Sequence, residues 1–226
     1  SGLGKEIALS ISEFSKNMIF VGRNKIKLLK LKKKIIKLYP SINIYIIITD
    51  LSKSFGVNKL IKEFKEQKKI KFVDVIINSA ANFSVKKIEN ITMHQLKQDF
   101  QINVISPFLI SKYFGLKMKK NGGGIIINIG SSSSYECSKN TSIYCSTKHA
   151  LLGMSKSFNS ELSSHGVKSI FVAPGSMQTL MGRKVKNQNF KTFIDPHEVA
   201  NIIKFLLYNQ KTMFIDELKI KRSVYK

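Results

Sequence analysis

The sequence predicts an α/β fold in which a doubly wound parallel sheet is covered by helices on both faces. Short apolar runs rich in β-branched residues alternate along the chain with longer amphipathic segments, and strands that alternate with helices form parallel sheets. The runs are hydrophobic almost without interruption, which is typical of strands buried on both sides. No internal repeat, low-complexity linker or change of composition divides the chain. We therefore expect one domain over residues 1–226.

Each expected element is assigned from the periodicity of its apolar residues. The strands are expected at 18–22, 42–48, 71–77, 124–129, 167–173 and 213–220. The helices are expected at 4–16, 25–38, 53–69, 92–120, 142–165 and 196–209. Residues 174–195 carry no clear pattern. A long loop in a compact domain is usually a functional lid or disordered.

The formal net charge of +24 raises the question of nucleic-acid binding. Only Arg23, Arg183 and Arg222 are arginines, whereas proteins that read phosphates and bases favour arginine forks. The lysines are scattered through every segment, and a bias toward A/T-rich codons explains much of them. In residues 25–40 they alternate with apolar residues at helical spacing, which indicates one buried and one solvated helix face. We do not expect a nucleic-acid partner.

The composition also bears on location. No apolar run approaches the roughly 18 residues that cross a bilayer, and the first residues lack the layout of a secretory signal. Cys137 and Cys145 are too few for a disulfide framework, which suits a reducing compartment. We expect a cytoplasmic protein that contacts no membrane. The histidines show no metal-ligand spacing, so no metal site is expected.

Glycines stand at the start of the first expected helix. Gly2 and Gly4 precede an amphipathic segment, and glycines at a helix start let the backbone approach a pyrophosphate at the positive end of the helix dipole. A tight turn without a ligand is the alternative. Arg23 follows the strand expected at 18–22, where dinucleotide folds meet the adenosine ribose. No Asp or Glu stands at this strand end, so a bound dinucleotide would be NADP(H) rather than NAD(H). A solvated arginine is the alternative here.

Tyr144 and Lys148 are four residues apart at the start of a helix-forming run and so lie on one helix face. A phenol with a pKa near 10 is only about 0.1% ionised at neutral pH. Using it as an acid or base calls for a neighbouring positive charge, which Lys148 would supply. A solvated helix pair is the alternative.

With these motifs in order, the chain resembles the short-chain dehydrogenase/reductase family over essentially its whole length. The matching segments are SGLGKEIA (1–8), ITDLS (48–52), NSAA (78–81), INVISPF (102–108), IINIGSS (126–132), YCSTK (144–148), APGSMQT (173–179) and DPHEVANIIKFLL (195–207). They resemble the family's glycine-rich turn, an adenine-contacting strand end, the Asn-Asn-Ala-Gly element, the catalytic residues, the Pro-Gly turn and the last long helix. Ser131 precedes Tyr144 by thirteen residues.

The resemblance implies a Rossmann-type sheet and hydride transfer between a nicotinamide and a ketone or secondary alcohol. Tyr144 would be the general acid and base, and Ser131 would hydrogen-bond the same oxygen of the substrate. Lys148 would lower the Tyr144 pKa and hold the nicotinamide ribose. Asn103 would anchor a water that connects this lysine to solvent. The protein would orient the cofactor and supply the proton.

The resemblance also implies the residues that bind the cofactor, which is expected to be NADP. These are Ser1, Gly2, Leu3, Gly4, Arg23, Asp50, Leu51, Asn78, Ala80, Tyr144, Lys148, Pro174, Gly175, Met177 and Thr179. Family members also form homodimers or homotetramers, and here the helices at 92–120 and 142–165 are the expected contacts.

The chain departs from the family pattern at three places. NSAA replaces the second Asn and the final Gly of its element, and Ser132, Ser133 and Ser134 follow Ser131 as alternative hydroxyls. The family's first strand, which lies between those expected at 18–22 and 71–77, is absent from the sequence. A sheet with that gap leaves buried backbone groups unpaired. We therefore expect the chain to be a piece of a longer protein, and to bind cofactor poorly without that strand.

Two other functions compete with a reductase or dehydrogenase of small carbonyl compounds. A 3-oxoacyl-thioester reductase is one, because a basic surface suits an acidic carrier protein. The C-terminal MFIDELKIKRSVYK departs from the glycine-ending tail of such reductases. A catalytically silent dinucleotide sensor or scaffold is the other. The intact set of Asn103, Ser131, Tyr144 and Lys148 argues against it.

Overall fold

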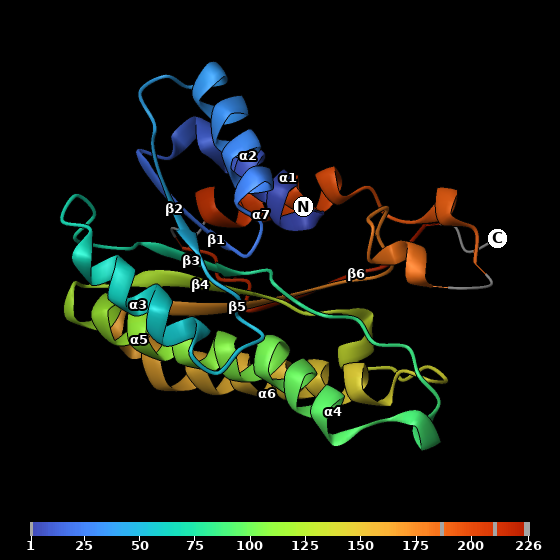
Figure 1. Ribbon diagram of the computed structural model, residues 1–226. Coiled ribbons are helices and arrows are strands. Elements are labelled where there is room, and N and C mark those ends of the chain that lie inside the picture. Colours follow the sequence, from blue (N-terminus) through green and yellow to red (C-terminus); the bar gives the residue numbers. More distant parts are fainter. Residues whose placement is uncertain (1, 186–187, 210–211, 224–226) are drawn as a thin grey trace.

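The computed structural model describes residues 2–185, 188–209 and 212–223 and has helices on both faces of a parallel sheet, as predicted (Figure 1). Its strands are β1 (Asn17–Gly22), β2 (Asn43–Ile48), β3 (Val75–Asn78), β4 (Gly124–Ile129), β5 (Val167–Pro174) and β6 (Glu217–Ile220). Its helices are α1 (Leu3–Ile11), α2 (Lys25–Leu38), α3 (Gly56–Glu66), α4 (Met93–Phe100), α5 (Ser106–Lys120), α6 (Ser142–Leu162) and α7 (Pro196–Tyr208). Every strand pair is parallel.

The sheet is interrupted where the sequence predicts a gap. One part has the strand order β1-β2 and the other β3-β4-β5-β6, and no ladder joins β1 to β3 among the described residues. All four residues of β3 are partly exposed, whereas Ile126 and Ile127 of the neighbouring β4 are fully buried. The edges of β1 and β3 therefore have backbone groups without a strand partner.

Alternate strand residues contact different helix layers. Ile127 and Ile129 of β4 belong to a core cluster with α1 and α7, while Ile126 packs against Met118 of α5 and Leu162 of α6. In Figure 1, α1, α2 and α7 lie above the sheet and α3, α4, α5 and α6 below it. This period of two follows from strand geometry, in which successive side chains point to opposite faces.

Several expected elements differ in the structure. The strand expected at 213–220 covers only Glu217–Ile220, and the helix expected at 4–16 ends at Ile11 and is followed by a 3₁₀ turn. The single helix expected at 92–120 comprises α4, a π-helical turn over Gln101–Ile105 and α5. The strand expected at 71–77 starts only at Val75, because its one ladder partner, β4, itself begins at Gly124.

The long segment without a sequence pattern folds back on itself. A β-bridge joins Met177 to Ile194, and short 3₁₀ turns occupy Gly182–Lys184 and Phe190–Thr192. Phe193 beside the bridge is buried. Of the helices in the described ranges, none has the length and apolar character needed to span a membrane.

Candidate active site

Tyr144 and Lys148 lie one turn apart at the start of α6, and both are buried. The ammonium nitrogen of Lys148 is 5.6 Å from the centre of the Tyr144 ring. It donates a 2.8 Å hydrogen bond to the carbonyl oxygen of Ile129, the last residue of β4. The α6 start is thereby tied to the carboxyl end of a central strand, where ligands of parallel sheets bind.

Ser131 reaches Tyr144 from the turn that follows β4. Gly130 permits this turn, because a Cβ there would lie 2.1 Å from the Phe171 ring. The hydroxyl of Ser131 lies near enough to the phenol of Tyr144 to lower its pKa, and it accepts from the backbone N–H of Ser133 at 3.1 Å. Of the four serines in the run, Ser131 is the one that acts on the Tyr144 pKa. The structure therefore brings together Ser131, Tyr144 and Lys148.

Burial dominates the proton affinities of this cluster. Burial raises the pKa of Tyr144 to about 12, against a smaller lowering by the neighbouring Ser131 hydroxyl. Burial also lowers the pKa of Lys148 to about 8. Removal of the phenolate from water outweighs the effect of the Ser131 hydroxyl; the lowering of the Tyr144 pKa by Lys148 stays a prediction. Both shifts favour the neutral form of each side chain.

Asn103 links the site to the segment after β3. It stands in the π-helical turn, and such turns are frequent at functional sites. Its amide oxygen accepts from Asn82 N–H at 2.8 Å, and its amide nitrogen donates to Asn82 O at 2.9 Å and to Thr147 Oγ1 at 3.0 Å. Thr147 in turn donates to Tyr144 O at 2.8 Å. Asn103 thus joins the loop to α6, and its side chain is bonded to Thr147 rather than to Lys148.

Sequence reasoning missed Asn82 and Asp99. The amide nitrogen of Asn82 donates to the carboxylate of buried Asp99 at 2.6 Å. No sequence motif predicts this pair. The one available signal is that Asn82, a polar residue, directly follows NSAA, where the backbone beyond β3 needs hydrogen-bond partners.

Phe83 covers the aromatic face of the site. Its ring meets that of Tyr144 edge to face at a centroid distance of 4.7 Å. Lys184, in the first short turn of the 174–195 segment, donates to Phe83 O at 3.2 Å. The segment without a sequence pattern therefore contacts the candidate active site, as expected for a lid.

The glycine-rich start of α1 meets two other predicted cofactor segments. Gly2 has a φ of 59°, and a Cβ on it would lie 3.5 Å from Thr179. A Cβ on Gly4 would lie 2.6 Å from Ser79 Oγ. Leu3, between them, is the first residue of α1 and is buried. The positive φ of Gly2 and the close approach of Ser79 to Gly4 favour glycine at both positions, and glycines leave the positive end of α1 open to an anion.

Arg23 and Asp50 lie together beyond the ends of β1 and β2. Arg23 is exposed, with its guanidinium 3.9 Å from the Asp50 carboxylate. Burial alone would raise the pKa of Asp50, but hydrogen bonds from Ser52 and the charge of Arg23 hold it below its ordinary value. The neighbouring Leu51 accepts a 2.7 Å hydrogen bond from Ser106. The structure thus places a cation and an anion side by side at the predicted adenosine end.

The other predicted cofactor residues fall into two groups. Asn78 is engaged within the sheet, where its amide donates to Ser111 Oγ at 3.0 Å and to Asn128 Oδ1 at 2.8 Å. Ala80 is exposed beyond β3. The remaining ones follow or end β5: Pro174, Gly175, Met177 and Thr179. Ser1 lies outside the described residues. Across the described part of the chain, no group of three His, Cys, Asp or Glu residues is arranged to hold a metal ion.

Comparisons with known proteins agree with this geometry. A relative is an uncharacterised oxidoreductase of Staphylococcus aureus (strain MRSA252), 26% identical over 221 residues that cover 98% of this chain and 93% of the relative. An alcohol dehydrogenase from the archaeon Thermococcus sibiricus, complexed with 5-hydroxy-NADP, superposes with a TM-score of 0.87 at 22% identity, covering 100% of this chain and 93% of that chain.

A short-chain dehydrogenase from Sphingobium yanoikuyae in complex with NADPH superposes with a TM-score of 0.83 at 20% identity, covering 98% of this chain and 84% of that chain. At these identities the structures establish the fold. The family model described as short chain dehydrogenase matches residues 1–189. Because that match spans most of its residues, the chain belongs to the short chain dehydrogenase family of oxidoreductase enzymes.

Proposed function

We propose that this protein is an NADP(H)-dependent oxidoreductase that transfers a hydride between nicotinamide and a ketone or secondary alcohol. The observation that carries the proposal is the arrangement of Lys148 and Ser131 around Tyr144: the buried Lys148 ammonium is 5.6 Å from the centre of the buried Tyr144 ring, and Ser131 lies near the phenol. An acid next to a hydrogen-bond donor and a buried cation is the arrangement that a carbonyl oxygen requires as it gains negative charge.

In the reductive direction, Tyr144 donates its proton to the carbonyl oxygen while Ser131 hydrogen-bonds that oxygen. The nicotinamide, when bound, supplies the hydride. Lys148 stabilises the phenolate that Tyr144 becomes, which offsets the cost of burying it. In the oxidative direction, Tyr144 takes the proton of the alcohol. Phe83 and the lid residue Lys184 shield this exchange from water.

The residues at the start of α1 fit a dinucleotide. The Gly2–Gly4 turn would take the pyrophosphate at the start of α1, where Gly2 has a positive φ and Ser79 lies where a side chain on Gly4 would stand. Exposed Arg23 would take the 2′-phosphate of NADP(H). The NADP ligands named for the Thermococcus sibiricus and Sphingobium yanoikuyae structures support this choice.

The same proposal includes a homo-oligomer. Apolar side chains on α5 and the turn before it remain exposed: Ile105, Phe108, Leu109 and Leu116. Large exposed apolar clusters are typical of protein contacts. Light scattering after gel filtration measures the mass, and a monomer at micromolar concentration would contradict this part.

Calorimetric titration with NADPH and NADH tests the cofactor. We expect tighter binding of NADPH, and an Arg23→Ala variant whose NADPH affinity falls to about its NADH affinity. Lys34→Ala removes an exposed charge farther along α2 and should leave the preference unchanged. Binding of neither nucleotide would refute the oxidoreductase proposal. Equal loss in both variants would refute the role of Arg23. A panel of ketones, followed by NADPH absorbance, then identifies the substrate.

A further inference from the structure

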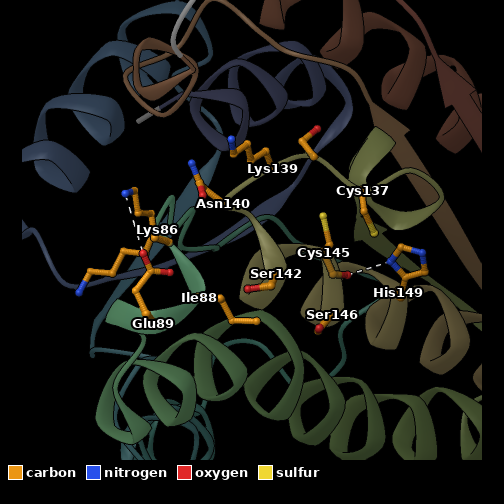
Figure 2. Close-up of a pocket in the computed structure, with 12 residues that line it drawn as sticks. Lys86, Ile88, Glu89, Cys137, Lys139, Asn140, Ser142, Cys145, Ser146 and His149 are labelled. Atoms are coloured by element: carbon orange, nitrogen blue, oxygen red, sulfur yellow. Dashed lines mark hydrogen bonds and ion pairs between the residues drawn. The ribbon is translucent and has the colours of Figure 1, made fainter.

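Two thiols line one open pocket beside the candidate active site. The pocket has a volume of about 870 Å³ and is lined by Cys137, Cys145 and His149, among other residues. Figure 2 shows Cys145 on the first turn of α6 and Cys137 on the loop that leads into this helix. Cys145 directly follows Tyr144 in the sequence, and consecutive residues of a helix point in different directions. The residues that line the pocket do not include Ser131, Tyr144 or Lys148.

The loop that carries Cys137 directly contacts Cys145. The sulfur of Cys145 is 3.8 Å from the carbonyl oxygen of Glu136, the residue that directly precedes Cys137. The neighbouring Cys145 thiol raises the Cys137 pKa. The loop between them is held as a turn by Thr141, whose hydroxyl donates to Ser138 O at 2.6 Å. A disulfide requires Cα atoms about 4.4–6.8 Å apart, and this turn holds the loop of Cys137 against the start of α6.

The thiols differ in access, which assigns their roles. Cys137 is exposed, whereas Cys145 is only 3% exposed. An oxidant from solvent therefore meets Cys137 first, and Cys145 stands beneath it as a resolving thiol. Solvent access and a neighbouring resolving thiol are two features of redox-sensitive cysteines, while the raised pKa of Cys137 makes its reactive thiolate less abundant.

We propose that Cys137 and Cys145 form a reversible intramolecular disulfide when the protein meets a peroxide. The Cys137 thiolate attacks one oxygen of hydrogen peroxide, so an S–O bond forms, the O–O bond breaks and hydroxide leaves. The Cys145 thiolate then attacks the Cys137 sulfur, so the S–S bond forms and the S–O bond breaks. With the two thiol protons, both oxygens leave as water. The peroxide is reduced and the two thiols are oxidised. A dithiol reverses the process by exchange.

This disulfide would also change the neighbourhood of Tyr144. The Cys145 sulfur would give up its 3.2 Å contact with Thr141 Oγ1 and draw the loop onto the first turn of α6. The same loop accepts a 2.8 Å hydrogen bond from Lys86 N–H through Asn140 O. Lys86 follows Phe83 by three residues. A shift of the Cys137 loop would therefore also move the segment that covers Tyr144. A transient disulfide of this kind is compatible with a reducing compartment.

The test treats the reduced protein with an equimolar amount of hydrogen peroxide and follows thiols and intact mass. We expect wild-type protein to lose both thiols, to become lighter by two hydrogens, to stay a single chain on a non-reducing gel, and to recover with dithiothreitol. In Cys145→Ser, Cys137 should stop at the sulfenic acid and be captured by dimedone. In Cys137→Ser, the buried Cys145 thiol should persist.

Three outcomes would overturn the proposal: disulfide-linked dimers, a sulfinic acid on Cys137, or equal dimedone capture in wild type and Cys145→Ser. Because thiols are counted without nucleotide or carbonyl substrate, the result does not depend on the proposed oxidoreductase activity.

Discussion

Phe83 meets Tyr144 edge to face, with ring centroids 4.7 Å apart and an interplanar angle of 74°. Its backbone oxygen accepts from Lys184 in the lid segment, and the residue before it, Asn82, is held by Asn103. The Phe83 ring thus occupies the space beside the proposed general acid, Tyr144. Its loop is held by hydrogen bonds to Lys184 on one side and to Asn103 on the other. The residue at position 83 therefore bears on the shape of the substrate that reaches Tyr144.

Replacing Phe83 by Ala should alter substrate preference. The edge contact contributes about 0.5–1.5 kcal/mol, so we expect kcat/KM for a small ketone to fall by up to about tenfold. The space left by the ring should admit a bulkier ketone and raise its relative kcat/KM. Phe83→Tyr keeps the ring and serves as the control. An unchanged ratio of kcat/KM for a small and a bulky ketone in Phe83→Ala would show that the ring does not shape the pocket.

Replacing Tyr144 by Phe should remove activity and leave the fold intact. The ring and its contact with Phe83 remain, while the proton donor is lost, and general acid catalysis contributes about 10²–10⁴-fold. We expect kcat to fall by at least about 100-fold, with NADPH affinity in calorimetry close to that of the wild type.

Tyr135→Phe is the matched control for this variant. The hydroxyl of Tyr135 donates to Glu217 at 2.6 Å, so its loss should reduce the free energy of unfolding by about 1–3 kcal/mol without lowering kcat. Comparable loss of kcat in the two variants would argue that Tyr144 acts through packing alone.

The fold and the reacting cluster were predictable because their signals are local. Apolar runs of period two or near-continuous hydrophobicity mark strands, and Tyr144 and Lys148 are a helical turn apart in the sequence itself. The gap between β1 and β3 was predictable as well, because the sequence has no apolar run that matches the family's first strand. Local sequence patterns thus suffice to predict the strands, the helices and the Tyr144–Lys148 pair.

The supporting contacts were not predictable for the opposite reason. Asn82 and Asp99 are 17 residues apart, and Asn103 and Thr147 are 44 apart. No periodicity relates such pairs, because they meet only after the loop and the helices have packed. The π-helical turn that presents Asn103 has no sequence signature either. The sequence likewise shows that Lys148 lies near Tyr144, but not that both side chains are buried.

Replacing Asn103 by Ala should destabilise the protein more than the loss of one hydrogen bond. The N–H and carbonyl groups of partly buried Asn82 would lose a partner, and the buried Thr147 hydroxyl would keep only its bond to Tyr144 O. A buried group left unpaired costs about 1–3 kcal/mol. We expect the free energy of unfolding in urea to fall by about 2–5 kcal/mol. Asn209→Ala, which removes an exposed amide bond to Phe205 O, is the control and should cost under about 1 kcal/mol. Similar losses in both variants would mean that the network around Asn103 contributes no more than a surface bond.

Replacing Lys148 by Met should change how stability depends on pH. The Lys148 pKa is lowered from 10.5 to about 8 by burial, so between these values the unfolded chain binds a proton that the folded protein does not. Stability of the wild type therefore rises with pH in this window. Tyr144 acts in the opposite sense, because its raised pKa contributes stability that is present below pH 10 and lost as the pH rises toward about 12. The window from pH 8 to 10 isolates the lysine.

In that window, urea unfolding of wild type and Lys148→Met should diverge in slope. The wild type should gain about 2–3 kcal/mol relative to Lys148→Met between pH 8 and 10, whatever the offset caused by leaving Ile129 O without its donor. Lys156→Met, at an exposed residue of the same helix, should run parallel to the wild type. Parallel curves for Lys148→Met would mean that Lys148 keeps its proton throughout, because its charge is solvated or paired in solution. If the wild type gains stability relative to Lys148→Met but not relative to Lys156→Met, burial destabilises the charged form of Lys148. That result is expected for a charge retained for catalysis.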